Sequence, residues 1–383
     1  MFRARYVIRF GLIVILLIAA LCSLHIFSSP REVGAQKTNL WRPFPDWSSQ
    51  SRLDTTRLGS AVVIPNIVHY VWALKDPEGA LEFQFKHFVS IYSSYLYLRP
   101  DVIYVHTNAR PSAILAAQRE HSSYWTQKVF EIPGVEVRRV EVPTHTKYGA
   151  ELEHMEHRSD FVRPGILRDF GGIYLDFDVV PIRDMKPLRE SGFRNVFGHE
   201  LGEKVNNGVM LSVKGSRFMD VFDRDQHEVF SGWWIEHSVL QLTRMANALM
   251  VIPNEVLILE RHAFIPDGFD DERHARLFRK HESPAVGMDD RQISFEDMDD
   301  DGFSYWNWSR SRPRQDWELD YSKSYTIHAL SPPLHVANRT PDCLAISWDY
   351  VMERTSNYAA QIYPAMLDAS NKLSIKANKA GTS

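Results

Sequence analysis

Two aspartates separated by a single residue, Asp176 and Asp178, are the side chains of this sequence most suited to chemistry. They follow the apolar stretch 173–175 and precede two valines, so both carboxylates are expected among buried residues. Burying unpaired carboxylates is costly unless something positive lies between them. Mg²⁺ and Mn²⁺ take oxygen ligands, often one or two carboxylates with substrate phosphate oxygens. The pair therefore predicts a divalent-metal site that neutralises a leaving diphosphate.

The residues before the pair strengthen this interpretation, because Asp-X-Asp by itself also suits a solvated turn or a calcium-binding loop. A short helix is expected over Ser159–Phe170, capped by its first residue and with Asp160 at its positive end. Gly171 and Gly172 then end the helix. Residues 173–175 form a strand with the aspartates at its carboxyl end, where ligands of open α/β sheets bind.

Short apolar runs alternate with longer amphipathic ones in the first part of the chain after residue 60. The runs are Ile67–Trp72, Leu81–Leu98, Val102–His106, Ala113–Arg119 and Val135–Val140. Alternation of strands and helices predicts an α/β fold with a mainly parallel sheet.

At this point a family resemblance is visible. Ser159-Asp160, Arg163 and 171–178 resemble the core signature of the glycosyltransferases with a sugar-binding DXD motif, a group that includes fungal initiating mannosyltransferases, large clostridial toxins and animal α-1,4-glycosyltransferases. Further likeness lies in Ile64–Trp72, Asn206–Met210, Gly232–Trp234 and Leu242–Arg244, and the resemblance spans roughly Ile64 to Leu330. It implies a GT-A type nucleotide-binding sheet flanked by helices. The implied reaction moves a sugar from a nucleotide-sugar to a glycan or glycolipid hydroxyl, with retention of configuration.

The resemblance also assigns roles to residues. Asp160 and Arg163 would hydrogen-bond hydroxyls of the donor sugar, although Arg163 as a plain surface cation is an alternative. Asp176 would touch the ribose or the water shell of the metal, and Asp178 would bind Mn²⁺ or Mg²⁺ directly. Pro164-Gly165 departs from the family pattern and is expected to interrupt the helix after Arg163, which would shift the sugar-binding geometry.

Two further residues are candidates for the same site. Trp72, which ends the first predicted strand, could stack on the base of the nucleotide, with packing in the core as the alternative. His328 follows a strand-like run and is expected to complete the metal or diphosphate site, since an imidazole can coordinate Mn²⁺ or donate to an oxygen. Its alternatives are a half-buried strand histidine, or His335 in its place.

Other polar residues are open to two interpretations each. Asn206 and Asn207 could hold a sugar hydroxyl or make a turn. Glu200 could act as an acid or base near the anomeric carbon. His154 and His157 have helical spacing but no third ligand nearby, which favours a solvated or capping role over a metal site.

The N-terminal region reads as a membrane anchor. Phe10–Phe27 contains no charged residue and follows Arg3, Arg5 and Arg9, an order that predicts one span with the remainder of the chain in the lumen. A cleaved signal peptide is the alternative. The expected organisation is a type II Golgi membrane protein with a cytosolic tail (1–9), a span (10–27), a stem (28–60), a catalytic domain (61–350) and a C-terminal helix with a polar tail (351–383).

Composition limits the remaining possibilities. The net charge of -4 gives no positive field for a polyanion, so nucleic acid is an unfavourable partner. Cys22 lies in the predicted span, which leaves Cys343 without a luminal partner within the chain. Asn307 and Asn338 fit the acceptor pattern for N-glycans and are expected in the lumen.

Two functions are alternatives to that of a transferase. One is a hydrolase of nucleotide-sugars, and the other is a non-catalytic luminal sugar-binding protein.

Overall fold

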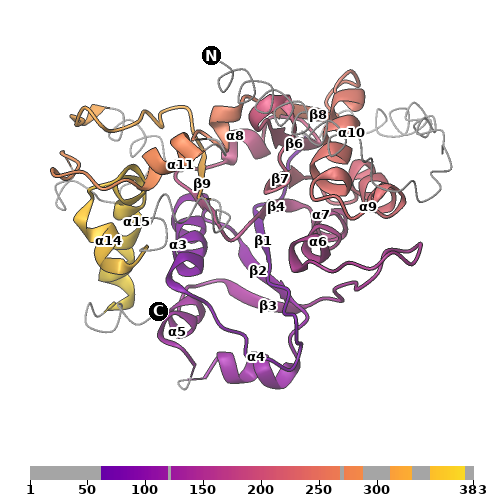
Figure 1. Ribbon diagram of the computed structural model, residues 1–383, viewed down its shortest axis with the longest axis horizontal. Helices are drawn as coiled ribbons and strands as arrows, with labels where there is room; N and C mark the ends of the chain where they lie inside the picture. The colour runs from indigo at the N-terminus through magenta and orange to yellow at the C-terminus, as the bar shows by residue number, and fades with distance from the viewer. Residues whose placement is uncertain (1–61, 120–121, 268–270, 288–310, 330–345, 376–383) are drawn as a thin grey trace, which may run out of the picture. The chain divides into compact units, whose positions relative to one another are not determined.

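A seven-stranded mixed sheet lies at the centre of the residues that the computed structural model describes, which are 62–119, 122–267, 271–287, 311–329 and 346–375 (Figure 1). The strands are β1 (Ile67–Val71), β2 (Val102–Thr107), β3 (Val135–Arg139), β4 (Gly172–Leu175), β6 (Asn195–Gly198), β7 (Val209–Ser212) and β8 (Val256–Leu259), in the order β3-β2-β1-β4-β7-β6-β8. Only β7 runs antiparallel to its neighbours, β4 and β6, while the other pairs are parallel. The predicted α/β fold with a mainly parallel sheet is confirmed.

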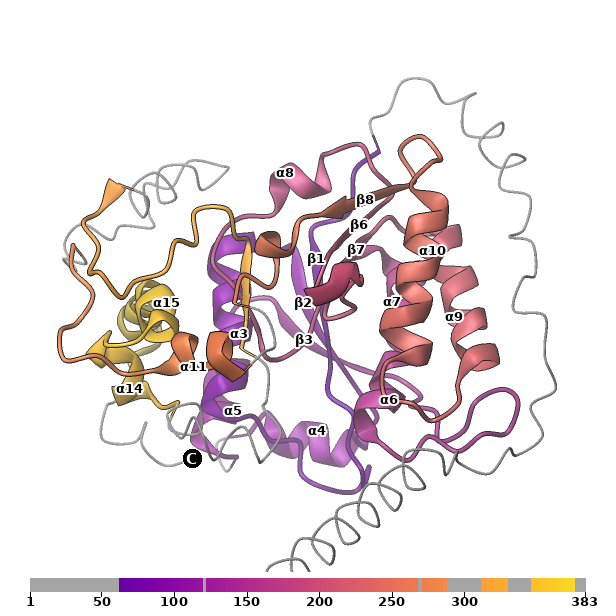
Figure 2. The ribbon, with the colours of Figure 1, turned by 45° about the horizontal axis from the view of Figure 1, so that its top comes forward.

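Helices cover both faces of this sheet, as Figures 1 and 2 show. One group is built around α3 (Phe85–Ser93), which is continued by the π-helical turn η2 (Ser94–Leu98) and lies beside β5. It also contains α5 (Tyr124–Phe130), α11 (Asp271–Phe278), α14 (Trp348–Glu353) and α15 (Asn357–Leu373). The other consists of α6 (Met155–Asp160), α7 (Arg163–Phe170), α9 (Arg217–Val229), η4 (Glu236–Leu240) and α10 (Gln241–Leu249). The remaining short helices are α4 (Pro111–Ala117), α8 (Lys186–Arg189), η3 (Leu201–Glu203) and η5 (Arg261–Ala263).

A second, two-stranded sheet joins distant parts of the chain. Strand β5 (Val179–Pro181) directly follows the aspartate pair and runs antiparallel to β9 (Thr326–His328). The register places Val179 opposite His328. This pairing brings a late histidine beside the two aspartates, although no local sequence pattern connects them.

The segment before β4 forms two helices, so the single helix expected over Ser159–Phe170 is wrong. Ser159 lies inside α6, which ends at Asp160, and α7 begins at Arg163. Pro164 occupies the first turn of α7, where a backbone N–H has no partner within the helix and proline is tolerated. The expected interruption after Arg163 is therefore also wrong, since Pro164 lies in the first turn of a helix that continues to Phe170.

Two glycines turn the chain from α7 into β4, as predicted. Gly171 and Gly172 both have positive φ, at 68° and 107°. A Cβ on Gly172 would lie 2.4 Å from the carbonyl oxygen of Ile67 in β1. The close approach of the two strands thus requires glycine here, and it fixes where β4 begins.

Several predictions fall outside the described residues. They concern the span 10–27 and the stem 28–60, and also Asn307, His335, Asn338 and Cys343. Within the described ranges, no helix combines the length and apolar character that crossing a membrane requires.

Candidate active site

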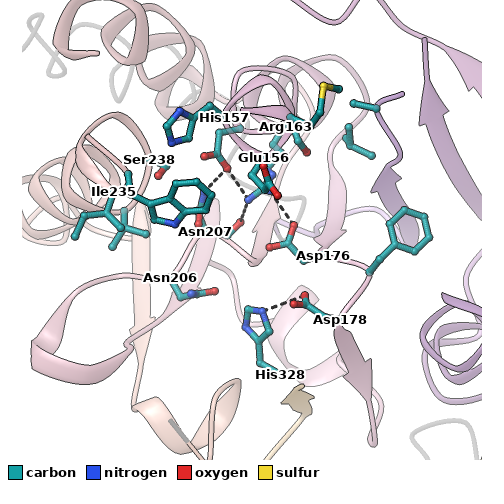
Figure 3. Close-up of a pocket in the computed structure, with 18 of the residues that line it drawn as sticks. Glu156, His157, Arg163, Asp176, Asp178, Asn206, Asn207, Ile235, Ser238 and His328 are labelled. Carbon is teal, nitrogen blue, oxygen red and sulfur yellow. Dashed lines mark hydrogen bonds and ion pairs between the residues drawn. The ribbon is translucent and has the colours of Figure 1, made fainter. Parts of the chain in front are cut away.

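A cavity of about 970 Å³ opens beside the carboxyl ends of β1 and β4 (Figure 3). All six site residues proposed from the sequence line it: Trp72, Asp160, Arg163, Asp176, Asp178 and His328. The cavity therefore lies where ligands of open α/β sheets bind.

Asp176, Asp178 and His328 form the candidate metal centre. Each offers one ligand atom, and the three atoms lie within 4.8 Å of one another. Burial raises the pKa of Asp176; Arg163 opposes this shift, and the neighbouring carboxylate of Asp178 adds to it. Two oxygens and one imidazole nitrogen form a donor set that suits a divalent cation such as Mn²⁺. The residues present thus fit the metal that the aspartate pair predicts.

His328 reaches the aspartates through the pairing of β9 with β5. Its Nε2 lies 3.2 Å from Oδ1 of Asp178, and its side chain is 4% exposed. Although burial alone would lower it, the carboxylates of Asp178 and Asp176 raise the pKa of His328. The half-buried strand histidine considered as an alternative is thus only partly right: the residue ends a strand, but its ring faces the candidate metal centre.

Gly208 provides the space in which His328 and Asp176 meet. A Cβ at this position would lie 2.7 Å from Cε1 of His328 and 2.8 Å from Oδ2 of Asp176. Its carbonyl oxygen also accepts a hydrogen bond of 2.9 Å from the backbone N–H of Asp176. Gly208 therefore shapes the site without contributing a functional group, a role that the sequence did not reveal.

Arg163 connects the candidate metal centre to Asp160. Its Nη1 lies 2.9 Å from Oδ1 of Asp160, and its Nη2 lies 3.0 Å from Oδ1 of Asp176. The guanidinium is buried, and Nη1 also donates to the carbonyl oxygen of Asn207 at 3.2 Å. Arg163 as a plain surface cation is therefore wrong, because its charge is needed between two buried carboxylates.

Asp160 has a second pair of partners on its other side. The amide of Asn207 donates to Oδ1 at 2.8 Å, and Nε2 of His237 lies 3.1 Å from Oδ2. Burial alone would raise the pKa of Asp160, but Arg163 and His237 hold it below its ordinary value. Asp160 is thus an ionised acceptor at the wall of the cavity.

Tyr174 and His237 are parts of this network that the sequence analysis missed. The Tyr174 hydroxyl donates to Oδ1 of Asp176 at 2.6 Å, and the guanidinium of Arg163 lies 4.8 Å from the centre of its ring. Tyr174 looked like an ordinary apolar strand residue, and its place two residues before Asp176 was the available signal. His237 comes from η4, and no spacing in the sequence points to Asp160.

Trp72 lines the cavity from the end of β1 and also packs against neighbouring aromatic rings. Its ring centre lies 4.5 Å from that of His87 and 5.1 Å from that of Phe177, the residue between the two aspartates. Phe177 also packs against Tyr70. Phe177 thus packs against rings of the core and also lines the cavity beside the two carboxylates. Stacking of Trp72 on a base stays a prediction.

Asn206 and Asn207 line the cavity, as does Glu200. Asn206 makes the predicted turn, since its Oδ1 accepts a hydrogen bond of 2.7 Å from the N–H of Gly208. Its Nδ2 donates to Oε2 of Glu200 at 3.0 Å, and Lys204 lies 3.4 Å from the other oxygen of that carboxylate. These three polar side chains therefore form one connected wall.

The expectation for His157 is wrong, because it is neither solvated nor capping. The residue is 1% exposed, and both ring nitrogens are buried with no hydrogen-bond partner among the described residues. Its ring packs 4.7 Å from that of His237 and 4.9 Å from that of Trp234. His154 is exposed, in agreement with a solvated position. Tertiary packing of η4 against α6 buries one member of the pair and leaves the other outside.

Comparison with known proteins agrees with this geometry. Residues 86–194 match the family described as the glycosyltransferase sugar-binding region containing DXD motif. Glucan organizing enzyme 1 of Cryptococcus neoformans var. grubii serotype A is 26% identical over 216 residues, which cover 53% of this chain and 54% of that protein. The chain thus spans about half the length of this curated relative.

Among solved structures, the PaToxG glycosyltransferase is similar at 13% identity and a TM-score of 0.36, over 54% of this chain and 78% of that one. The bifunctional glycosyltransferase WbbM is similar at 10% identity and a TM-score of 0.36, over 80% and 52% of the two chains. The family match contains the DXD segment, which provides Asp176 and Asp178 of the candidate metal centre, whereas His328 lies outside the match. Residues 86–194 of this chain thus match the sugar-binding region that contains the DXD motif in glycosyltransferases.

Proposed function

We propose that this protein is a metal-dependent glycosyltransferase with a GT-A type fold, which transfers a sugar from a nucleotide-sugar to a hydroxyl of a glycan or glycolipid. The observation that carries the proposal is the convergence of Asp176, Asp178 and His328 at the wall of the cavity that Asp160 and Arg163 also line. The first three suit a metal diphosphate, and the other two offer acceptors and donors for sugar hydroxyls. Retention of configuration rests on the family resemblance alone.

Asp178 and His328 would hold Mn²⁺ or Mg²⁺, with Asp176 as a third ligand or a partner of its water shell. When bound, the metal supplies positive charge to the leaving diphosphate. Arg163 holds the carboxylates of Asp160 and Asp176 in place through contacts of 2.9 and 3.0 Å. Lys86 has an exposed ammonium at the wall of the cavity, where it suits a diphosphate oxygen.

Release of nucleoside diphosphate from a panel of nucleotide-sugars tests the proposal directly. We expect release that depends on Mn²⁺ and rises when an acceptor is added. Release that is the same with and without acceptors would identify a hydrolase, and donor binding without any release would identify a sugar-binding protein. The anomeric configuration of the transferred sugar, read by NMR, tests retention separately.

The relative's name suggests the first acceptors to try. Because that protein is called a glucan organizing enzyme, oligosaccharides of glucose with α and β linkages are a rational first panel.

We also propose a Golgi location with the catalytic domain in the lumen, supported by the apolar run Phe10–Phe27 after three arginines. Membrane extraction of the full chain with carbonate, compared with a chain that starts at Arg52, would test that anchor.

A further inference from the structure

Two adjacent tryptophans, of which the second lines the candidate active site, have much of their surface uncovered. Trp233 is 60% exposed and Trp234 is 52% exposed, and both belong to the few large apolar side chains that are exposed among the described residues. Trp234 also lines the cavity that contains the aspartate pair. An exposed aromatic pair continuous with a polar cavity is typical of a ligand-binding surface.

The segment that carries the tryptophans is well anchored. Gly232 has a φ of 86°, and the Ser231 hydroxyl donates to the carboxylate of Glu236 across the turn. The backbone N–H of Glu236 in turn donates to the carbonyl oxygen of Trp233. A platform held in this way loses little conformational freedom when a ligand stacks on it.

Trp234 is supported from one side by histidines. Its ring centre lies 4.9 Å from that of His157 and 5.4 Å from that of His154. His157 is itself buried against η4, so the supporting imidazole is fixed. The indole is thus oriented by packing while about half of its residue surface stays open to solvent.

The cavity has both an apolar and a polar wall. Ile235 and Val239 line it together with Trp234, and Figure 3 shows Ile235 and Ser238 across the view from Asp176 and Asp178. The connected polar wall of Glu200, Lys204 and Asn206 lines the same cavity. A sugar ring has an apolar C–H face and a polar edge of hydroxyls, so it matches such a pair of walls.

From this geometry we infer that Trp233 and Trp234 form the acceptor subsite, which takes a saccharide chain. Trp234 stacks on the sugar that receives the new linkage, and Trp233 stacks on the next sugar along. The inference rests on the proposed transferase function, because it names the acceptor of that same site. The diphosphate end of the donor is left to the opposite side, where the aspartates and His328 lie (Figure 3).

The test uses the donor that the nucleotide-sugar panel identifies, with a simple glucoside and oligosaccharides of two to seven glucose units as acceptors. We expect Trp234→Ala to raise the acceptor KM by about tenfold or more, in line with the loss of one aromatic stacking contact. The donor KM should change less than about twofold, and the ratio of transfer to donor hydrolysis should fall. Trp234→Tyr, which keeps a ring for stacking, should recover most of the loss.

Trp233→Ala should weaken only acceptors with two or more sugars. Leu115→Ala removes another exposed apolar side chain, 54% exposed and outside the cavity, and serves as the matched control. A rise in donor KM without a rise in acceptor KM would place Trp234 at the donor and overturn the inference. Acceptor and donor KM values that stay unchanged in both tryptophan variants would overturn it as well.

Failure of the proposed function looks different. If the wild type releases no nucleoside diphosphate from any donor, the transferase proposal fails while the platform remains testable by calorimetry. Titration of maltoheptaose and laminariheptaose into wild type and Trp234→Ala without donor then decides. Binding that is lost in the variant supports the saccharide subsite, whereas equal binding, or none to the wild type, contradicts it.

Discussion

Two buried histidine clusters in this protein have opposite surroundings. In the first, His328 lies 3.2 Å from the carboxylate of Asp178, and the carboxylates raise its pKa. In the second, Nδ1 of His69 lies 3.0 Å from Nε2 of His106, and Nε2 of His69 lies 2.8 Å from the carbonyl oxygen of Gly171. Burial lowers the pKa of His69 to about 4 and that of His106 to about 3.

The difference teaches how to separate a ligand from a structural histidine. The pair in β1 and β2 is packed among the rings of Tyr104 and Phe170, and its contact with the Gly171 carbonyl ties it to the turn before β4. His328 instead faces two carboxylates beside a cavity. Burial alone is therefore uninformative, whereas the charge of the neighbours distinguishes the two roles.

The largest expected effect comes from Asp178→Asn, which keeps the shape of the side chain and removes a ligand charge. Transfer should fall by at least about 100-fold, since even changes around a metal site commonly cost ~10–100-fold. Initial rates at saturating Mn²⁺ measure it, with His69→Asn as the matched variant in the structural cluster. Transfer by Asp178→Asn at the rate of wild type would remove the metal assignment and erase the contrast between the clusters.

His328→Ala should raise the Mn²⁺ concentration for half-maximal activity by about 10–100-fold. The reason is the loss of one of three ligand atoms that lie within 4.8 Å of one another. A metal titration measures the shift, and His69→Asn should titrate like wild type. If both variants give the wild-type curve, His328 is structural and the two clusters have the same role.

Gly208→Ala should have a smaller effect, a loss of about tenfold in transfer at low Mn²⁺. The added Cβ would lie less than 3 Å from His328 and Asp176, so both side chains must move by a few tenths of an ångström. A full 1 Å misplacement can cost ~100-fold in reaction rate, so a smaller loss is expected here. Gly165→Ala is the control, because its Cβ would meet only Arg168, at 3.8 Å. Equal activity of the two alanine variants would show that Gly208 does not shape the site.

The smallest effect on activity, and a clear one on stability, concerns the structural pair. Both folded pKa values lie below the ordinary 6.5, so the unfolded chain binds more protons between that pH and the folded values. The contribution of the two neutral histidines to the free energy of unfolding is complete above pH 6.5. It is lost as the pH falls toward 4, by about 1.4 kcal/mol per pH unit for each histidine.

Denaturant unfolding at pH 7 and pH 5 measures this loss, with His106→Asn to remove one titrating group. The variant should show a shallower dependence on pH than wild type and an unchanged Mn²⁺ titration. His154→Gln, which replaces an exposed histidine, should leave the slope as it is. A wild-type slope in His106→Asn would mean that the pair does not control acid stability.

Local patterns predicted much of the fold correctly. The positions of β1, β2, β3 and β4 follow from apolar runs of strand length, and the turn at Gly171-Gly172 follows from residues that tolerate positive φ. The split between α6 and α7 was missed, although Pro164 signals it. Proline has no N–H for the hydrogen bond of a continuing helix and is tolerated in the first turn, so a new helix begins beside it.

The sequence by itself determined the carboxylate pair at a strand end, and with it the expectation of a metal and a nucleotide-sugar, because those residues are neighbours along the chain. Only the tertiary structure decided that Gly208 makes room for His328, that His237 holds Asp160, and that Trp234 lines the same cavity. These contacts join segments that are distant in sequence. Their geometry depends on strand pairing and core packing, which short-range periodicity does not encode.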